Sequence, residues 1–153
     1  MGTETERKYL VTSGDYPKQH PVKITQGFIS TDKSKVVRVR LTENKATLTI
    51  KSGNHSLMRK EFEYDIPVED ARILLAEICI KPVIEKTRYT INLADLTWEI
   101  DFFHGLNEGL VIAEVELQDT GQAIQLPDWV GQEVTGDPKY YNANLVKMPY
   151  SLW

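Results

Sequence analysis

The stretch "KVVRVRLTENKATLTIKS", residues 35–52, decides the fold. Side chains of a β-strand point alternately to the two faces of a sheet. This stretch alternates between polar or charged and apolar residues on both sides of Glu43-Asn44-Lys45. We therefore predict two antiparallel strands, at 35–42 and 45–52, joined by a tight turn.

The same two-residue period recurs along most of the chain. It predicts eight strands, at 3–11, 22–30, 35–42, 45–52, 56–65, 82–92, 95–103 and 109–118. One helix begins near Pro67 and carries an apolar stripe that should pack on a sheet. After Gln118 the alternation stops, and a short helix is expected from about Pro138 to Lys147. Eight such strands suit a closed antiparallel barrel, formed by one domain over residues 1–153.

The overall composition limits the partners of the chain. The 153 residues carry a formal net charge of −4, so bulk attraction does not recruit nucleic acid or an anionic membrane surface. Cys79 is the single cysteine, and no apolar run approaches the ~18 residues of a membrane span. We expect a cytoplasmic protein without nucleic-acid or membrane partners.

Charged residues of like sign occur in pairs, two positions apart, on one face of nearly every predicted strand. These doublets are Glu4 with Glu6, Arg38 with Arg40, Glu61 with Glu63, Lys86 with Arg88, Glu99 with Asp101, and Glu114 with Glu116. Neighbours on the same face of a strand lie ~6.6 Å apart, so each doublet repels by roughly 2.5 kcal/mol at an effective dielectric constant near 20. A solvated sheet face explains the alternation but not the sorting by sign.

A barrel with a charged lumen explains this sorting, with one acidic wall, one basic wall and an apolar outer face that helices partly cover. A chain of phosphates would neutralise the basic wall. The basic residues available for it are Arg38, Arg40, Lys51, Arg59, Lys86 and Arg88. The carboxylates would hold metal ions, and ligands that are all oxygen favour Mg²⁺ or Mn²⁺.

These residues resemble the motifs of the CYTH, or triphosphate tunnel metalloenzyme, superfamily. Glu4-x-Glu6-x-Lys8 is similar to its N-terminal E-x-E-x-K signature. The other matching motifs, in order, are Arg38-x-Arg40, Lys51 at the end of "TLTIK", Arg59-x-Glu61-x-Glu63, "EKTR" with Lys86 and Arg88, Asp101 of "EIDFF", "EVE" with Glu114 and Glu116, and Lys139. The resemblance covers almost the whole chain. It implies an eight-stranded tunnel that binds a small-molecule triphosphate with divalent metal, and a possible homodimer.

The resemblance to the short bacterial members implies an enzyme that hydrolyses inorganic tripolyphosphate to pyrophosphate and phosphate. The expected metal ligands are Glu4, Glu6, Glu63, Asp101, Glu114 and Glu116, with Glu61 and Glu99 as further candidates. Lys8 and Lys86 are the expected catalytic residues. Phosphate would be bound by Arg38, Arg40, Lys51, Arg59, Lys86, Arg88 and Lys139. One departure is Phe28, where several short relatives carry tyrosine; Tyr140 and Tyr141 are candidate substitutes.

Three other functions would need the same phosphate-binding residues. A class IV-type adenylate cyclase would also need a purine pocket, for which no residues are evident, and a cyclic AMP assay would identify it. A thiamine triphosphatase would need aromatic contacts, which Trp129 or Trp153 could supply. A polyphosphate-binding module would bind anions without turnover, and the many carboxylates argue against it.

Overall fold

The computed structural model describes residues 6–52, 60–118 and 121–153, and its main feature is one antiparallel sheet of nine strands. The strands are β1 (Glu6–Val11), β2 (Val22–Asp32), β3 (Lys35–Leu41), β4 (Ala46–Ser52), β5 (Lys60–Ile66), β6 (Ile80–Leu93), β7 (Leu96–Phe103), β8 (Val111–Glu116) and β9 (Val130–Glu133). Their order in the sheet is β5-β4-β3-β2-β6-β7-β8-β1-β9. The predicted antiparallel, mainly β fold is confirmed.

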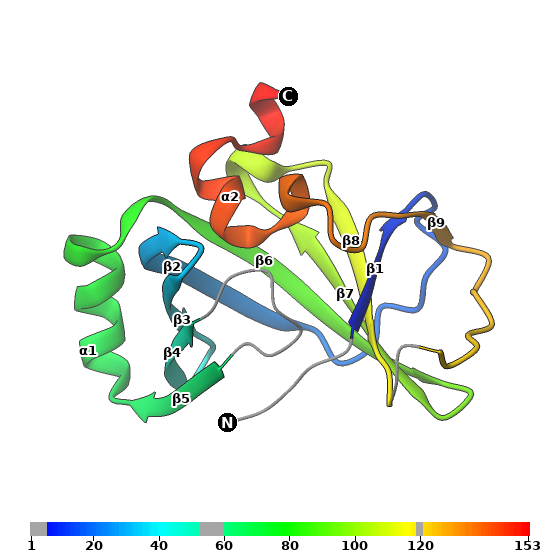
Figure 1. The fold of residues 1–153 in the computed structure, drawn as a ribbon, viewed down its shortest axis with the longest axis horizontal. Coiled ribbons are helices and arrows are strands. Elements are labelled where there is room, and N and C mark those ends of the chain that lie inside the picture. Colours follow the sequence, from blue (N-terminus) through cyan, green and yellow to red (C-terminus); the bar gives the residue numbers. More distant parts are fainter. Residues whose placement is uncertain (1–5, 53–59, 119–120) are drawn as a thin grey trace.

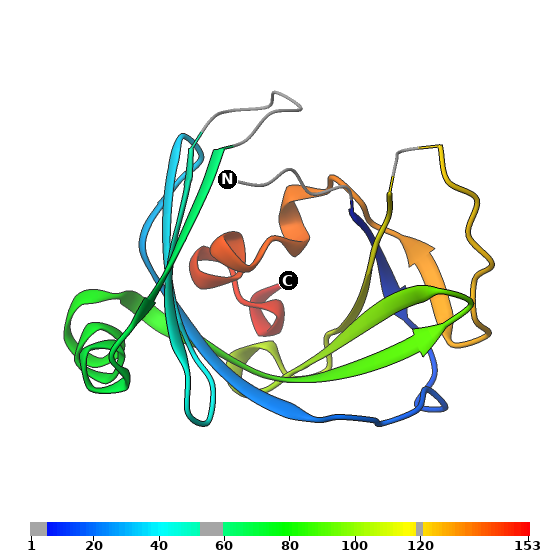
Figure 2. The ribbon, with the colours of Figure 1, turned by 90° about the horizontal axis from the view of Figure 1, so that it is seen from below.

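Over the residues that the structure describes, the sheet curls into a trough and does not close into a barrel (Figure 2). The prediction of a closed, eight-stranded barrel is wrong on both points. β1 pairs on one edge with β8, where Glu6 lies opposite Glu116, and on the other edge with β9, where Tyr9 lies opposite Glu133. Among the described strands, β9 rather than β5 lies on the second edge of β1, so β5 and β9 are the two edges of an open sheet. β9 was not expected because its sequence, "VGQE", does not alternate.

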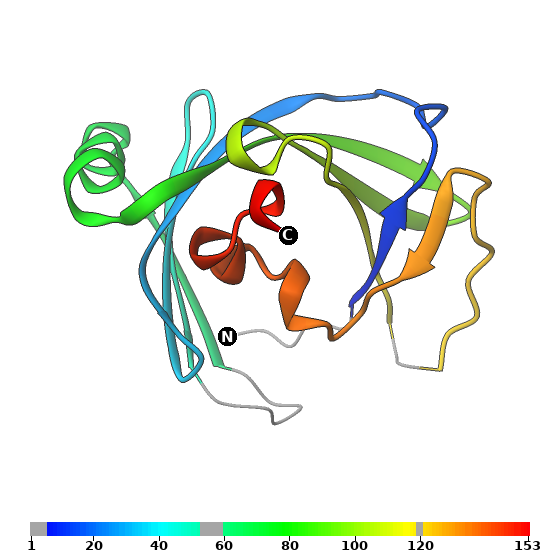
Figure 3. The same cartoon turned by 90° about the horizontal axis from the view of Figure 1, so that it is seen from above.

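Helical segments lie on both sides of the sheet (Figures 1 and 3). They are α1 (Val68–Ile73), the π-helical turn η1 (Leu74–Ile78), η2 (Gly105–Asn107), η3 (Pro138–Tyr140), α2 (Asn142–Lys147) and η4 (Tyr150–Leu152). α1 and η1 pack on the convex side, whereas η3, α2 and η4 lie inside the curve of the trough. No helix in the described residues is long and apolar enough to cross a membrane.

The convex face of the sheet is apolar, as predicted. Under α1 and η1, Val39 packs with Ala71 and Cys79. At the other end of the same face, Trp98 and Tyr9 pack under Trp129, which belongs to the segment before β9. This half of the outer face is therefore covered by connecting segments rather than by a helix.

The concave face is charged over only part of its length, which differs from the predicted lumen with one acidic and one basic wall. At one end, Phe28, Ile84 and Phe103 are buried against Leu145 and Val146 of α2. Burying this much apolar surface anchors the C-terminal segment in the trough, because removing apolar area from water is the main favourable term in folding. The remaining part of the concave face carries the charged side chains.

Candidate active site

A buried ion cluster lies on the concave face where β6 and β7 pair. Arg88 lies opposite Asp101 in the register of these strands. Its guanidinium donates two hydrogen bonds to the Asp101 carboxylate, from Nε to Oδ1 at 2.7 Å and from Nη2 to Oδ2 at 2.9 Å. The Lys86 ammonium binds the same Asp101 oxygen, Oδ2, at 2.8 Å. One carboxylate therefore holds two cations of the same strand in fixed positions.

Burial and these ion pairs shift the pKa values of the cluster. Burial alone would raise the pKa of Asp101, but Lys86 and Arg88 hold that pKa well below its usual range. Burial lowers the pKa of Lys86 to about 8, against the attraction of Asp101 and with the help of Arg88 and Arg40. Lys86 is only 2% exposed. Burial thus makes its charged form costly here, and the attraction of Asp101 offsets only part of that cost.

Arg40 of β3 lies near this cluster and has a neutral partner. Its Nε donates to the side-chain oxygen of Gln26 at 3.0 Å. Burial, together with the nearby cations Arg38 and Arg88, lowers the pKa of Arg40 to about 10, against the more distant attraction of Asp101 and Glu99. Within the described part of the chain, Arg40 has no carboxylate within ion-pair distance and its terminal NH₂ groups make no hydrogen bond.

Arg38 is held on the opposite wall, by β4 and β5. Its Nη2 donates to Thr49 Oγ1 at 3.3 Å, and the Thr49 hydroxyl donates to Glu63 Oε1 at 3.0 Å. Glu63 Oε1 also lies 3.8 Å from Arg38 Nη2. On the same wall, Lys51 lies opposite Glu61. The predicted acids of β5 therefore face basic residues of β3 and β4.

The other predicted acids gather on β1, β7 and β8. Glu6 lies directly opposite Glu116, and Glu114 lies opposite both Lys8 and Glu99. Lys8 Nζ is 3.6 Å from Glu114 Oε1. Burial alone would raise the pKa of Glu114, but the Lys8 ammonium, with Lys86 and Arg88, holds it below its ordinary value.

The chemistry of this acidic group fits a hard divalent cation. Like charges placed directly opposite one another destabilise a sheet, and a cation between them would reverse that effect. The donors are all carboxylate oxygens, which suit Mg²⁺ or Mn²⁺. In the residues that the structure describes, no three such side chains already converge on one point. Glu4, a further predicted ligand, lies outside these residues.

Comparison of the sequence with models of known protein families gives a match. The model of the CYTH domain matches residues 2–147, which is nearly the whole chain. The chain belongs to the CYTH family. The resemblance inferred from the sequence motifs is therefore confirmed.

Two curated CYTH relatives carry the same name, inorganic triphosphatase. The protein of Acetivibrio thermocellus is 51% identical over 152 residues, covering 98% of this chain and 97% of the relative. The protein of Nitrosomonas europaea is 36% identical over 147 residues, covering 94% and 96%. A solved structure of an inorganic triphosphatase matches with a TM-score of 0.72 at 33% identity, over 95% of each chain.

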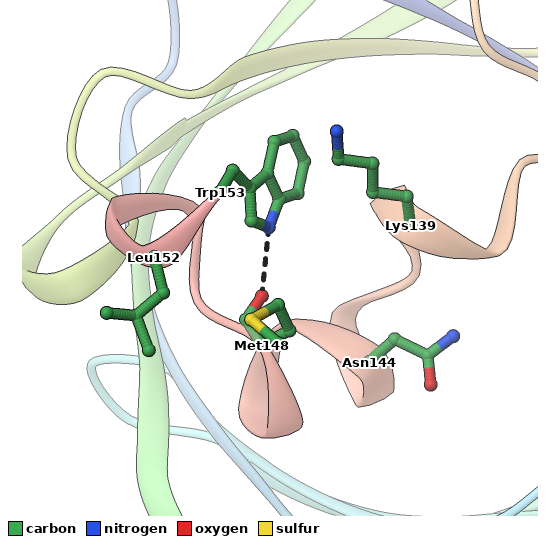
Figure 4. Close-up of a pocket in the computed structure, with 5 residues that line it drawn as sticks. All are labelled: Lys139, Asn144, Met148, Leu152 and Trp153. Carbon is green, nitrogen blue, oxygen red and sulfur yellow. Dashed lines mark hydrogen bonds between the residues drawn. The ribbon is translucent and has the colours of Figure 1, made fainter.

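Most of the described CYTH residues that we predicted from the sequence lie on the strands of the trough, whereas Lys139 lies in the C-terminal segment. Glu4 and Arg59 lie outside the described residues. Lys139 extends over the ring of Trp153, with Nζ 4.0 Å from the ring centre, and lines a shallow pocket of about 320 Å³ in the C-terminal segment (Figure 4). Its predicted role in binding phosphate stays a prediction.

The two candidate tyrosines have different surroundings. Lys8 Nζ lies 5.1 Å from the ring centre of Tyr141, whereas Tyr140 packs against Trp153. Phe28 is buried in the apolar end of the trough, with α2. Of the two tyrosines, Tyr141 is the one that contacts a predicted catalytic residue.

Sequence reasoning missed two neutral residues of the site, Gln26 and Asn142. Gln26 lies on β2 at a position that shares the concave face with Arg40, so the alternation could have identified it. Asn142 begins α2, and its side-chain oxygen accepts a hydrogen bond from Lys86 Nζ at 2.9 Å. No local pattern marks it, because its position depends on how the C-terminal segment enters the trough.

Proposed function

We propose that this CYTH protein hydrolyses inorganic tripolyphosphate to pyrophosphate and phosphate, with Mg²⁺ or Mn²⁺. The observation that carries the proposal is Arg40, a largely buried guanidinium whose hydrogen-bond partner in the described residues is the neutral Gln26. A buried cation without a counterion is costly. A multiply charged anion in the trough would remove that cost, and the planar guanidinium suits phosphate oxygens.

The basic residues would bind the phosphate chain along the concave face. Arg38 and Arg40 lie on β3 and Lys86 and Arg88 on β6, with β2 between these strands. Lys51 and Arg59 would extend this group. These cations would neutralise charge that develops on the leaving phosphate, and positioning and electrostatics usually dominate phosphoryl transfer. Lys8, between Glu114 and Tyr141, would bind phosphate or assist proton transfer.

The main proposed metal ligands are Glu4, Glu6, Glu114 and Glu116. A bound divalent ion would orient the phosphates and lower the pKa of a water molecule that attacks phosphorus. Asp101 and Glu63 remain proposed ligands, with Glu61 and Glu99 as further candidates. In the structure Asp101 is bound by Lys86 and Arg88, and we assign to it the additional role of fixing these two cations.

The family membership and the relatives' names support this proposal. Both curated relatives are named inorganic triphosphatase, and they cover nearly the whole of this chain. The prediction of a triphosphatase is confirmed by these relatives. The choice of ion and the roles of individual residues rest on the geometry described above.

The test is phosphate release from tripolyphosphate, pyrophosphate, ATP and thiamine triphosphate, each with Mg²⁺, Mn²⁺ or excess chelator. We expect rapid release from tripolyphosphate that stops in chelator. Glu116→Gln should lower this activity at least tenfold, while Glu43→Gln, in the exposed β3–β4 turn, should leave it unchanged. Full activity in chelator would contradict the metal requirement, and no release from tripolyphosphate would contradict the function.

A further inference from the structure

Two neutral amides, Gln26 and Asn142, connect two cations of the proposed site. Gln26 Oε1 accepts from Arg40 Nε at 3.0 Å, and Gln26 Nε2 donates to Asn142 Oδ1 at 2.5 Å. The same Asn142 oxygen accepts from Lys86 Nζ at 2.9 Å. The chain of contacts runs from β3 through β2 and α2 to β6, so it joins three strands and the C-terminal segment.

The direction of each amide in this chain is determined by the cations at its ends. Arginine and lysine side chains only donate hydrogen bonds. The oxygen of Gln26 must therefore face Arg40, and the oxygen of Asn142 must face Lys86. The Gln26 NH₂ group then points to the Asn142 oxygen, which is the contact observed. The hydrogen bonds between Arg40, Gln26, Asn142 and Lys86 can all form in only one orientation of the two amide groups.

The amides fix the two cations without neutralising them. A carboxylate in place of Gln26 would also hold Arg40, but it would cancel the positive charge that an anionic substrate needs. With Nε bound to Gln26, the two terminal NH₂ groups of Arg40 remain available, within the described residues, for phosphate oxygens. Lys86 is held from two sides, by Asp101 and by Asn142, and is therefore restricted to one position.

We propose that Gln26 and Asn142 are positioning residues of the triphosphatase, acting as one unit that sets the place of Arg40 and Lys86 relative to the phosphate chain. This proposal rests on the function proposed above. It assigns to α2 a role in the reaction, since the sheet alone cannot supply Asn142. Misplacing a positioned group by about 1 Å can cost on the order of 100-fold in rate.

The test is a double-mutant cycle on tripolyphosphate hydrolysis with Gln26→Met, which keeps the volume of the side chain, and Asn142→Ala. Each should lower kcat about 10- to 100-fold and change KM less than about threefold, because the other cations still hold the substrate. The double variant should be no slower than the slower single variant, since the two residues act as a unit. Independent, multiplying effects, or a single variant with the parent kcat, would overturn the proposal.

Asn144→Ala is the matched control. Asn144 lies on the same helix and its side chain donates to the carbonyl oxygen of Pro138, at 2.8 Å. General weakening of α2 should affect both asparagine variants, so an equal loss of kcat in Asn144→Ala would also overturn the proposal. Thermal unfolding of all variants shows whether they remain folded at the assay temperature.

A second measurement does not depend on turnover. In the substrate-free protein the Lys86 ammonium is buried and held by two acceptors, so its NMR signal should be visible and protected from solvent exchange. We expect the signal to persist in Asn144→Ala and to broaden or disappear in Asn142→Ala. An unchanged signal in Asn142→Ala would refute the positioning role. An inactive parent protein with the expected NMR result would instead refute the proposed function.

Discussion

Arg88 and Asp101 face each other across β6 and β7 in a two-point ion pair, with oxygen–nitrogen distances of 2.7 and 2.9 Å. Asp101 is 2% exposed, so its charge is removed from water and must be compensated. The same carboxylate also binds Lys86. Much of the stability of the concave wall therefore depends on this single acid.

We expect Asp101→Ala to destabilise the protein by about 3–5 kcal/mol, because it leaves two buried cations without their carboxylate. Glu99→Gln is the matched control: Glu99 also binds Arg88, at 3.2 Å, but its side chain is 40% exposed. The loss of unfolding free energy in Glu99→Gln should stay below about 1 kcal/mol. Urea unfolding measures the loss in both variants. Equal losses in the two variants would show that burial does not decide the strength of these pairs.

Gly27 of β2 lies against η1 on the outer face of the sheet. A Cβ atom at this position would lie 2.9 Å from both Cβ and Sγ of Cys79. Gly27→Ala should therefore cost about 1–3 kcal/mol through overpacking. Gly14→Ala, where a Cβ would meet no atom within 4 Å, should be neutral or slightly stabilising. Thermal unfolding compares them, and a stable Gly27→Ala variant would mean that η1 can move away.

The ion pair of Arg7 with Glu133 joins β1 to β9 and should make stability depend on pH. Hydrogen bonds from Arg7 and Thr135 lower the pKa of Glu133 to about 2, from an ordinary value of 4.5. The pKa of Glu133 is lower in the folded protein than in the unfolded chain. The ion pair therefore contributes fully to stability above about pH 4.5, and this contribution is lost as the pH falls through about 2. Both side chains are at least one-third exposed, so it should not exceed about 1 kcal/mol.

Glu133→Gln should accordingly be less stable than the parent at pH 7, and this difference should shrink steadily as the pH falls from about 4.5 to about 2, as measured by urea unfolding over this range. Adding Arg7→Gln to this variant should cause little further loss at pH 7, because the partner is already absent. A stability difference of the same size at pH 2 as at pH 7 would show that Glu133 acts through packing rather than through its charge.

Leu145 of α2 is fully buried in the apolar end of the trough. Leu145→Ala should cost about 2–5 kcal/mol, from lost apolar burial and the cavity left behind. Leu152→Ala, at a side chain that is 68% exposed, should change stability by no more than about 0.5 kcal/mol. Denaturant unfolding measures the loss of stability in each variant. A small effect of Leu145→Ala would mean that α2 is held mainly by its polar contacts.

The sequence predicted the strands well because the alternation of charged and apolar residues reports directly on the two faces of a sheet. It placed Arg38, Lys86, Glu99 and Glu114 on one face, and the structure puts all of them in the trough. That the sheet stays open could not be predicted in this way. The edge of the sheet beyond β1 is formed by β9, a short strand that pairs with β1 from far along the chain.

The contents of the trough were also beyond local patterns. The sequence predicted a short helix at about 138–147, but the pattern gives no information about the face of the sheet that receives Leu145 and Val146. Gln26 and Asn142 carry no charge, so the search for like-charged doublets passed over them. A homodimer and a cytoplasmic location stay predictions, as do the roles of Glu4 and Arg59, which lie outside the described residues.

The order of the strands in space also sets an order in time during folding. β2 to β5 are neighbours both along the chain and in the sheet, so Arg38, Arg40 and Glu63 can come together while later segments are still being synthesised. Glu6 must instead wait for Glu116, and closing so long a loop is entropically costly and slow. We therefore expect the acidic group of β1 and β8 to assemble last, and an incompletely synthesised chain to present Lys8 without its later partner Glu114.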